Sequence, residues 1–386
     1  MKITAIKPLI VYGRLINWIF VKVETDEGLV GWGEATLEWK PKGVVGCLED
    51  LSQLALGQDP RRTEFLWQVL YRQFFIKPGI VALAAISGID QACWDIHAKS
   101  LGVPLYQLLG GAVRDRVRMY DHLGGGDIDA VFNLGQDQRY LECAARSVEA
   151  GYTALKIVLP PRTKNLDSAQ KVKRAAQLMK VLREGLGDEI DIMLDFHGRT
   201  SPDMAIMYGK ALKPHRPFWL EEPCPPENPK GLAKVAKSVA IPIASGERVV
   251  TRYGFVPILE AGSCAVIQPD VCHTGGITEL RKIAAMADAY YVSIAPHNPM
   301  GPIATAVNVH LAMATPNFLI QESLRTDVPW RDEVVKNPVQ IEKGYARPST
   351  APGIGIEVDE EAAKKHPYQP DTILRLFHED GSVADW

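Results

Sequence analysis

The sequence predicts an α/β protein in which a (β/α)8-type barrel follows an N-terminal α+β domain. The chain has 386 residues, 46% of them hydrophobic, which is enough for a barrel and a companion domain with a large core. From Val117 onward, short apolar runs alternate with amphipathic helical stretches, as repeated βα units require. Polar residues follow several of these runs at nearly constant spacing, which indicates that one structural unit recurs.

Residues 1–115 are interpreted as the α+β domain. β-branched and aromatic residues predict three strands, and Thr25–Gly28 is a turn signal before the third strand. Helical periodicity then takes over. The expected strands are Ile3–Tyr12, Trp18–Glu24 and Leu29–Glu34, and the expected helices are Val44–Leu56, Thr63–Tyr71 and Val81–Leu101.

Residues 116–325 are interpreted as the barrel, and residues 326–386 as a C-terminal segment that packs back on the first domain. The expected barrel strands are Val117–Asp121, Ala154–Val158, Asp191–Asp195, Phe218–Glu221, Ile243–Ala244, Val266–Gln268, Tyr291–Ile294 and Phe318–Gln321. A doubly wound open sheet is the alternative. It calls for a glycine-rich phosphate loop after its first strand, and Gly124–Asp127 does not match the dinucleotide pattern.

Composition narrows the partners and the compartment. The formal net charge is -3, with 43 basic and 46 acidic residues, so no basic footprint for nucleic acid or an anionic membrane is expected. The first residues lack the pattern of a signal peptide, and no apolar run is long enough for a membrane span. Six cysteines are scattered without a CxxC pair, which favours free thiols in a reducing cytoplasm over disulfides or a zinc site.

Carboxylates at successive strand ends predict a metal site. Asp195, Glu221 and Glu247 each end or follow an expected strand, and each is 26 residues after the one before (195 to 221, 221 to 247). About 250 residues make eight βα units, so this spacing places the three side chains on one rim of the barrel. Three adjacent carboxylates repel one another unless a cation joins them, and hard oxygen ligands suit Mg²⁺. The alternative is that each carboxylate caps a helix or forms an ion pair.

Two histidines predict acid–base chemistry at the same rim. Asp270 and His297 end neighbouring strands, 27 residues apart (270 to 297), so the aspartate can orient the imidazole and raise its basicity. His197 lies two residues after Asp195 and points the same way if the strand continues. For each histidine, the alternative is a packed, hydrogen-bonded side chain without a catalytic role.

Taken together, these motifs resemble the enolase superfamily in its mandelate racemase branch. The ordered set is Asp195, Glu221 in LEEP, Glu247 in SGER, Asp270 in QPD, His297 in APH and Glu322 in QES. The stretch Ala85–Lys99, with Pro104-Leu105 and Leu108–Gly110, is similar to the family's helical signature, and Glu24–Ala35 is similar to its opening. The resemblance covers nearly the whole chain. It implies an N-terminal capping domain, a (β/α)7β barrel and one Mg²⁺ per subunit.

Within that branch, Asp195–Arg199 and the ending Val383–Trp386 resemble the sugar-acid dehydratases, most closely the galactonate dehydratase group. The resemblance implies a hydro-lyase that converts an aldonate to a 2-keto-3-deoxy acid. His297 would be the base at C2, His197 the acid that protonates the leaving 3-hydroxyl, and a protonated Glu322 a donor to the developing oxyanion. Racemases of this branch carry a second lysine after the second strand, where this chain has Val158.

The substrate contacts are less determined. Lys156 can help to neutralise the substrate, or it can be an ion-paired lysine of the barrel. His122 resembles a histidine of mannonate dehydratases, and its alternative is a structural role. The loops Arg14–Trp18, with Asn17 and Trp18, and Tyr71–Pro78 are expected to choose the substrate. Mannonate, gluconate or arabinonate dehydration, racemisation, and a non-catalytic sugar-acid-binding protein remain alternatives. Because relatives form symmetric assemblies, a homo-oligomer is expected.

Overall fold

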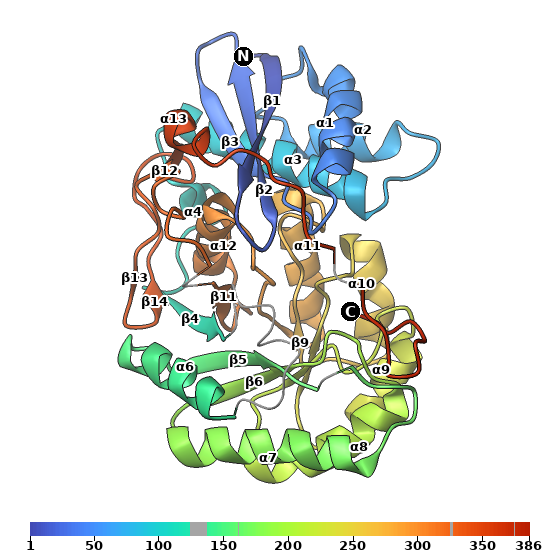
Figure 1. Cartoon of the computed structure of the whole chain (residues 1–386). Helices are drawn as coiled ribbons and strands as arrows, with labels where there is room; N and C mark the ends of the chain where they lie inside the picture. The colour runs from blue at the N-terminus through green and yellow to red at the C-terminus, as the bar shows by residue number, and fades with distance from the viewer. Residues whose placement is uncertain (124–136, 161, 325–326, 374) are drawn as a thin grey trace.

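The structure is a computed structural model that describes residues 1–123, 137–160, 162–324, 327–373 and 375–386. The stretch Gly124–Asp127 and the expected boundary at residues 325 and 326 lie outside these residues. Figure 1 shows two layers, an antiparallel sheet with its helices above and a barrel below. In the described part of the chain, no helix combines the length and the apolar character that crossing a membrane requires.

The upper layer is built from the three expected strands and three helices. The strands form an antiparallel sheet in the order β1-β2-β3, and helix α3 packs directly on β3. A Cβ atom at Gly33 would lie 2.0 Å from the backbone oxygen of Gly88, so only glycine permits this close approach. The bounds are β1 Ile3–Tyr12, β2 Asn17–Thr25, β3 Val30–Glu34, α1 Pro41–Ala55, α2 Thr63–Arg72 and α3 Ile80–Leu101.

The lower layer is a parallel barrel in which seven described helices alternate with eight strands, so it is a (β/α)7β barrel. A short helix α4, Leu105–Leu108, precedes it, and a 3-10 turn η1, Lys213–His215, follows α8. The strands are β4 Val117–His122, β5 Ala154–Val158, β6 Asp191–Asp195, β7 Leu220–Glu221, β8 Ile243–Ser245, β9 Val266–Ile267, β10 Ser293–Ile294 and β11 Gln321–Ser323. The helices are α6 Asp137–Glu149, α7 Ala169–Leu186, α8 Pro202–Leu212, α9 Pro229–Ser238, α10 Thr251–Glu260, α11 Gly276–Ala289 and α12 Pro302–Ala314.

The last barrel strand differs from the expected Phe318–Gln321. Phe318 forms only an isolated parallel bridge with Ile294, and the ladder that closes the barrel joins β11 to β4 three residues later. The prediction was wrong because the apolar run marks the residues that enter the barrel, whereas pairing with β4 defines the strand. Glu322 therefore lies inside a strand and not beyond its end.

The barrel interior is filled by buried side chains and is not a pore. One side chain from the region of each strand contributes to this inner cluster, which contains Tyr120, Ala154, Met193, Trp219, Ala244, Val266, Ala295 and Ile320. Such filling is usual for eight-stranded barrels. The solid interior leaves the C-terminal rim of the strands as the place where polar side chains can gather.

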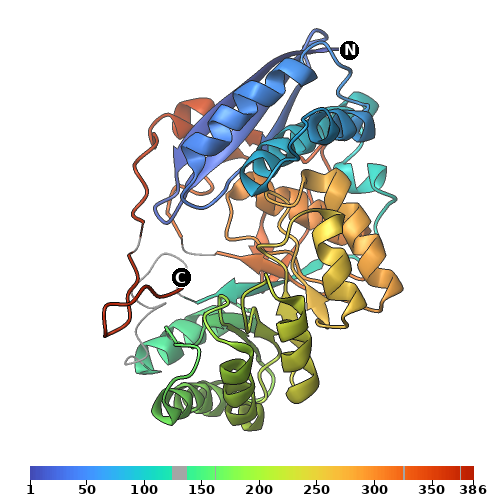
Figure 2. The same ribbon diagram turned by 90° about the vertical axis from the view of Figure 1, so that its right-hand side faces the viewer.

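The C-terminal segment packs on the N-terminal domain, and it also reaches the barrel. The indole of Trp330 donates to the Tyr12 oxygen at 2.9 Å and stacks on His366 at 4.4 Å. Figures 1 and 2 show the last residues running from α13 down one side and ending between the two layers. The elements of this segment are β12 Val335–Lys336, β13 Ile341–Glu342, β14 Tyr345–Ala346, β15 Glu357–Val358 and α13 Glu360–Ala363, of which β14 pairs with β4.

Thr278 at the start of α11 joins the two layers through buried hydrogen bonds. Its hydroxyl donates to Asp90 of α3 at 2.5 Å and accepts from the indole of Trp94 at 2.8 Å. The backbone N–H of Thr278 also donates to Asp90 at 2.9 Å. Helix α3 is thus tied to the barrel by buried hydrogen bonds.

We expect Thr278→Val to lower the free energy of unfolding by about 1–3 kcal/mol, because it leaves Asp90 and the Trp94 indole each short of a partner in a buried place. Thr278→Ser keeps the hydroxyl and should lose about 1 kcal/mol or less. Urea unfolding of both variants measures the difference. Equal stability of the valine and serine variants would contradict the role of the hydroxyl.

Candidate active site

Three carboxylates meet at the C-terminal rim of the barrel. Asp195 ends β6, Glu221 ends β7, and Glu247 follows β8. One oxygen of each lies within 4.8 Å of the others, and Asp195 and Glu221 are fully buried. Parallel pairing sets this convergence, because Asp195 lies opposite Glu221 in the ladder. The sequence spacing therefore does correspond to one cluster in space.

Lys156 of β5 lies within this cluster. Its Nζ is 2.8 Å from Glu221 and 3.3 Å from Asp195, and it also lies 2.7 Å from Glu322 of β11. The side chain is 1% exposed, and burial alone would lower its pKa, but the surrounding carboxylates hold the pKa well above the ordinary value. Lys156 is therefore a cation with three acidic partners, which places it beside the predicted metal site.

The donor set fits a divalent cation. Burial and the neighbouring Asp195 raise the pKa of Glu221 to about 8, and burial raises the pKa of Glu247 well above its ordinary range. Glu247 Oε2 also has no hydrogen-bond partner among the described residues. Crowded carboxylates of this kind are what a bound cation relieves, and an all-oxygen set suits Mg²⁺. The three residues can hold such an ion.

His297 and Asp270 form the expected pair. The Nδ1 atom of His297 lies 2.8 Å from Asp270 Oδ2, and its Nε2 atom lies 3.7 Å from Glu247. Burial opposes the charged imidazolium, but Glu247, Asp270 and Glu322 outweigh it and hold the pKa of His297 well above the ordinary value. The imidazole therefore has one nitrogen held by an aspartate and the other directed at the carboxylate cluster.

His273, which the sequence reading did not single out, lies beside this pair. It belongs to a second group of potential metal ligands with Asp270 and His297. However, its Nε2 atom lies 3.3 Å from Glu38, which is contributed by the upper layer. Burial would lower the pKa of His273, but Asp270 and Glu38 raise it to about 9. This geometry favours a charged, paired histidine over a metal ligand.

His197 reaches the cluster by a route that the sequence reading did not foresee. Strand β6 ends at Asp195, and His197 adopts a left-handed conformation with φ 49°, so simple strand alternation does not apply. Its Nε2 atom nevertheless lies 3.1 Å from Asp195 Oδ2. The chain turns back over the strand end, and the imidazole contacts Asp195 while His297 contacts Glu247.

Glu322 lies among cationic side chains that favour its ionised form, whereas the expected role as a hydrogen-bond donor requires the protonated form. Burial alone would raise its pKa, but Lys156, His297 and His122 lower it to about 2. Its second oxygen accepts the Asn298 N–H at 2.8 Å. An ionised Glu322 can only accept hydrogen bonds, so it holds Lys156 and cannot donate to an oxyanion.

His122 ends β4 and faces the same space. Its Nδ1 atom lies 3.5 Å from Glu322 Oε1, and neither ring nitrogen has a hydrogen-bond partner among the described residues. Burial and the charge of Lys156 lower its pKa to about 4, so the ring is neutral near pH 7. A neutral imidazole with unsatisfied nitrogens is suited to bind a polar ligand.

Most of these side chains line a cavity of about 340 Å³ between the two layers, and Asp195, Glu221 and Asp270 lie behind its lining. Its apolar part is formed by Leu15, Ile16, Leu37, Trp39, Ile80 and Pro299. A second set of lining residues is polar or aromatic and consists of Glu38, Lys40, His122, Lys156, His197, Glu247, Arg248, His273, His297, Glu322 and Trp386. The site is thus closed by the upper layer on one side and by the barrel rim on the other.

Two expected substrate contacts do not line this cavity. The amide of Asn17 donates to the Gln369 oxygen at 2.8 Å and to Asp371 at 2.6 Å, so it anchors the C-terminal segment. Trp18 is 1% exposed and belongs to the apolar core. Neighbouring side chains of a strand face opposite sides of the sheet. Asn17 and Trp18 are both buried, so both sides of the sheet are covered at this point. The loop Arg14–Trp18 contributes through Leu15 and Ile16 instead, whereas no residue of Tyr71–Pro78 lines the cavity.

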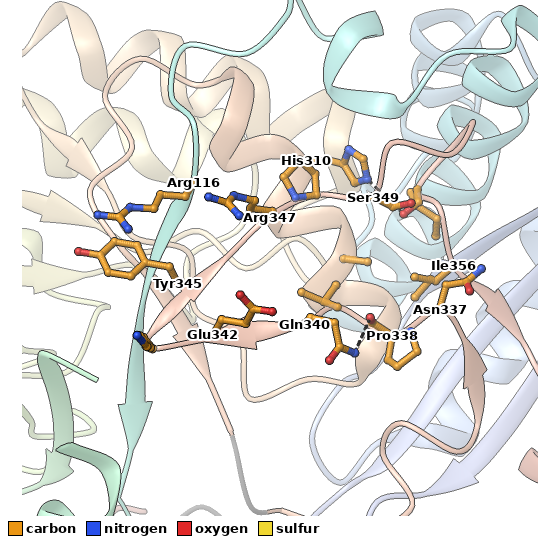
Figure 3. Close-up of a pocket in the computed structure, with 15 residues that line it drawn as sticks. Arg116, His310, Asn337, Pro338, Gln340, Glu342, Tyr345, Arg347, Ser349 and Ile356 are labelled. Atoms are coloured by element: carbon orange, nitrogen blue, oxygen red, sulfur yellow. Dashed lines mark hydrogen bonds between the residues drawn. The ribbon is translucent and has the colours of Figure 1, made fainter. Parts of the chain in front are cut away.

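A larger cavity of about 860 Å³ lies elsewhere, between the β13–β14 hairpin and the outside of the barrel (Figure 3). Its basic side chains, Arg116, Lys343 and Arg347, are exposed. His310 is its one buried imidazole among the described lining residues, and both ring nitrogens are occupied by backbone partners. This cavity has no cluster of reactive groups, so size alone does not identify the active site.

The sequence reading missed Glu38, Trp39, His273 and Trp386 as lining residues. His273 had a usable signal, because it lies three residues after Asp270 at the same strand end. Glu38 and Trp39 come from the loop after β3, and Trp386 comes from the far end of the chain. No periodicity or spacing relates these three to the barrel rim.

Comparisons with known proteins agree with this architecture. Residues 15–110 match the mandelate racemase/muconate lactonizing enzyme N-terminal domain, and residues 139–362 match the enolase C-terminal domain-like family. The chain belongs to the enolase superfamily, in its mandelate racemase/muconate lactonizing enzyme branch.

Individual relatives cover the whole chain. It is 40% identical to a D-galactonate dehydratase of Ralstonia nicotianae and 39% identical to one of Pectobacterium atrosepticum, over 100% of both sequences in each case. Among solved structures, an enolase superfamily member from Salmonella Typhimurium has a TM-score of 0.89 at 35% identity, covering 95% of this chain and 98% of that one. A mandelate racemase/muconate lactonizing enzyme-like protein from Roseovarius has a TM-score of 0.89 at 34% identity, covering 96% of each chain.

The Glu38–His273 ion pair predicts a pH dependence of stability. The pKa of His273 is raised to about 9 in the folded protein, so its contribution is fully present below its unfolded value of about 6.5 and is lost as the pH rises through 9. We expect the free energy of unfolding to fall between pH 7 and 9, and His273→Gln to flatten that fall. Chemical denaturation across this range measures it, with His378→Gln as a control. An identical slope in His273→Gln would contradict the assignment.

Proposed function

We propose that the protein is a hydro-lyase that dehydrates a sugar acid, an aldonate of the galactonate type, to a 2-keto-3-deoxy acid. The observation that carries the proposal is the pair of imidazoles on one carboxylate cluster. His297 lies 3.7 Å from Glu247, and His197 lies 3.1 Å from Asp195. Dehydration removes a proton from one carbon and a hydroxyl from the next, so it requires a base at one position and an acid at another. The full-length relatives named D-galactonate dehydratase support the substrate class.

Asp195, Glu221 and Glu247 would hold one Mg²⁺. When bound, the ion supplies positive charge that stabilises the extra negative charge of an enediolate. Lys156 adds a second positive charge beside Glu221 and Glu322, where it can face the substrate carboxylate. These charges make abstraction of an otherwise weakly acidic α-proton feasible.

In the proposed reaction, His297 in its neutral form takes the proton from C2, and Asp270 stabilises the imidazolium through Nδ1. A cation held by Glu247 would offset the negative charge that raises the pKa of His297, and would so favour this neutral form. Electrons of the enediolate then form the C2–C3 double bond as the C3–O bond breaks. His197 gives the proton on its Nε2 atom to the departing hydroxyl, which leaves as water. The resulting enol tautomerises to the 2-keto acid. Glu322, ionised, keeps Lys156 in place.

Racemisation is the second candidate within the family, and Val158 argues against it. A racemase needs a second base on the opposite face of C2. Val158 at the end of β5 lies opposite Asp195 in the ladder, is 2% exposed and has no proton-accepting group. Val158, which stands where the racemases have their second lysine, therefore cannot take up or return a proton.

A substrate screen tests the proposed function. Galactonate, gluconate, mannonate and arabinonate, together with aldarates, are incubated with the enzyme and Mg²⁺, and 2-keto acid formation is measured. Formation of a 2-keto-3-deoxy acid from galactonate supports the proposal. Reaction of only another aldonate would move the specificity to that sugar, and reaction of none would refute the dehydratase assignment.

His297→Asn should lower turnover by at least about a hundredfold and abolish exchange of the C2 proton with solvent, because general base catalysis contributes on this scale. Asparagine keeps a polar side chain at this position but cannot take up the proton. Proton NMR in heavy water measures exchange, and calorimetry checks that Mg²⁺ still binds. Retained turnover would remove His297 as the base.

Removal of the metal should also abolish turnover. We expect a chelator to inactivate the enzyme, Mg²⁺ to restore it, and Glu221→Gln to weaken Mg²⁺ binding by at least about tenfold, since loss of even an outer-shell partner costs that much. Titration calorimetry measures the affinity. Asp203→Asn on α8, which alters an exposed acid paired with Lys234, is the matched control and should bind normally. Unchanged affinity in Glu221→Gln would contradict the ligand assignment.

A further inference from the structure

Residues 376–386 form a hairpin that ends at the cavity. Phe377 and Val383 make an antiparallel bridge, and the Ala384 N–H donates to the Leu376 oxygen at 3.0 Å. The hairpin is anchored on the loop after β5, where the Arg162 guanidinium donates to the Phe377 oxygen at 2.9 Å. This contact anchors the hairpin on the barrel rim.

The hairpin places the indole of Trp386 against the proposed acid. The ring centroids of Trp386 and His197 are 4.9 Å apart, and those of Trp386 and Trp39 are 5.1 Å apart. All three rings line the same cavity. Trp386 is therefore in contact with one ring from the upper layer and one from the barrel.

Arg199 links the same two residues by hydrogen bonds. Its Nε donates to the backbone oxygen of Trp386 at 2.7 Å, and its Nη2 lies 3.3 Å from His197 Nδ1. A guanidinium can only donate, so Nδ1 accepts, and the proton of a neutral His197 ring lies on Nε2. Burial lowers the pKa of Arg199 only to about 10, so it stays charged at neutral pH. One buried cation thus orients the imidazole and holds the tryptophan.

His197 needs such support because no strand holds it. Its φ of 49° lies in the left-handed region, which is strained for a residue with a side chain, and Trp39 shares this feature with φ 56°. Strained conformations persist when surrounding contacts over-determine them. The Trp386 ring and Arg199 are contacts of this kind.

We propose that Trp386 is a positioning residue that holds His197 in the orientation required to protonate the leaving hydroxyl. The inference rests on the proposed function. It separates two steps of the reaction: proton abstraction depends on His297, whereas loss of water depends on His197. When His197 is misplaced, the enediolate forms but returns to substrate more often, and it takes up a proton from solvent as it does so.

The test measures both steps in heavy water with Mg²⁺ and the aldonate that the wild-type enzyme dehydrates. Proton NMR follows loss of the C2 proton in recovered substrate and formation of product. Trp386→Ala should lower dehydration turnover by about tenfold to a hundredfold, since small misplacements of a catalytic group have effects of this size. The ratio of exchange to product should rise, and Trp386→Phe, which keeps an aromatic ring, should restore most of the dehydration.

Trp386→Leu keeps apolar volume without a ring and serves if the alanine variant does not fold, which thermal unfolding checks. Val383→Ala is the matched control, because this side chain of the same hairpin is 81% exposed and points away from the core. An unchanged exchange-to-product ratio in the alanine and leucine variants would overturn the inference, whether or not KM rises. A wild-type enzyme that dehydrates no aldonate would instead refute the proposed function.

Discussion

The electrostatic crowding of carboxylates at the barrel rim is the constraint on which the site depends. Parallel pairing places Asp195 and Glu221 side by side, and the next βα unit adds Glu247. Such a buried cluster is unfavourable by itself, because each ionised carboxylate is desolvated and repelled by the others. Lys156 offsets part of this charge within the chain. The remaining negative charge makes the rim a cation site, and every other feature of the cavity is arranged around it.

The two proposed proton-transfer groups differ in how they are held. His297 follows β10 and is oriented by Asp270, which follows β9, so both partners of this pair come from the barrel rim itself. His197 lies past its strand in a left-handed turn and depends on contacts from distant parts of the chain. The proposed base is therefore held by partners within the barrel, whereas the proposed acid is also held by the C-terminal hairpin. This difference explains why elimination, more than proton abstraction, should respond to changes at the chain's end.

The upper layer and the C-terminal segment complete what the barrel begins. Glu38 from the loop after β3 pairs with His273, and Asn17 anchors the segment whose end reaches the cavity. The layers are joined by the buried network around Thr278. Cover from both layers leaves the reacting groups largely buried, which strengthens the electrostatic interactions between them.

The sequence by itself determined the barrel, its companion domain and the residues that converge at the rim, because βα repeats have a nearly constant length and strand ends meet at one edge. Asp195, Glu221, Glu247, Asp270 and His297 were predictable for this reason. Only the tertiary structure decided the cationic surroundings of Glu322, which include Lys156 of β5, and the contacts of Asn17 and Trp18, which follow from packing. Glu38, Trp39 and Trp386 could not be predicted, since contacts between loops of different domains leave no periodic signal in the sequence.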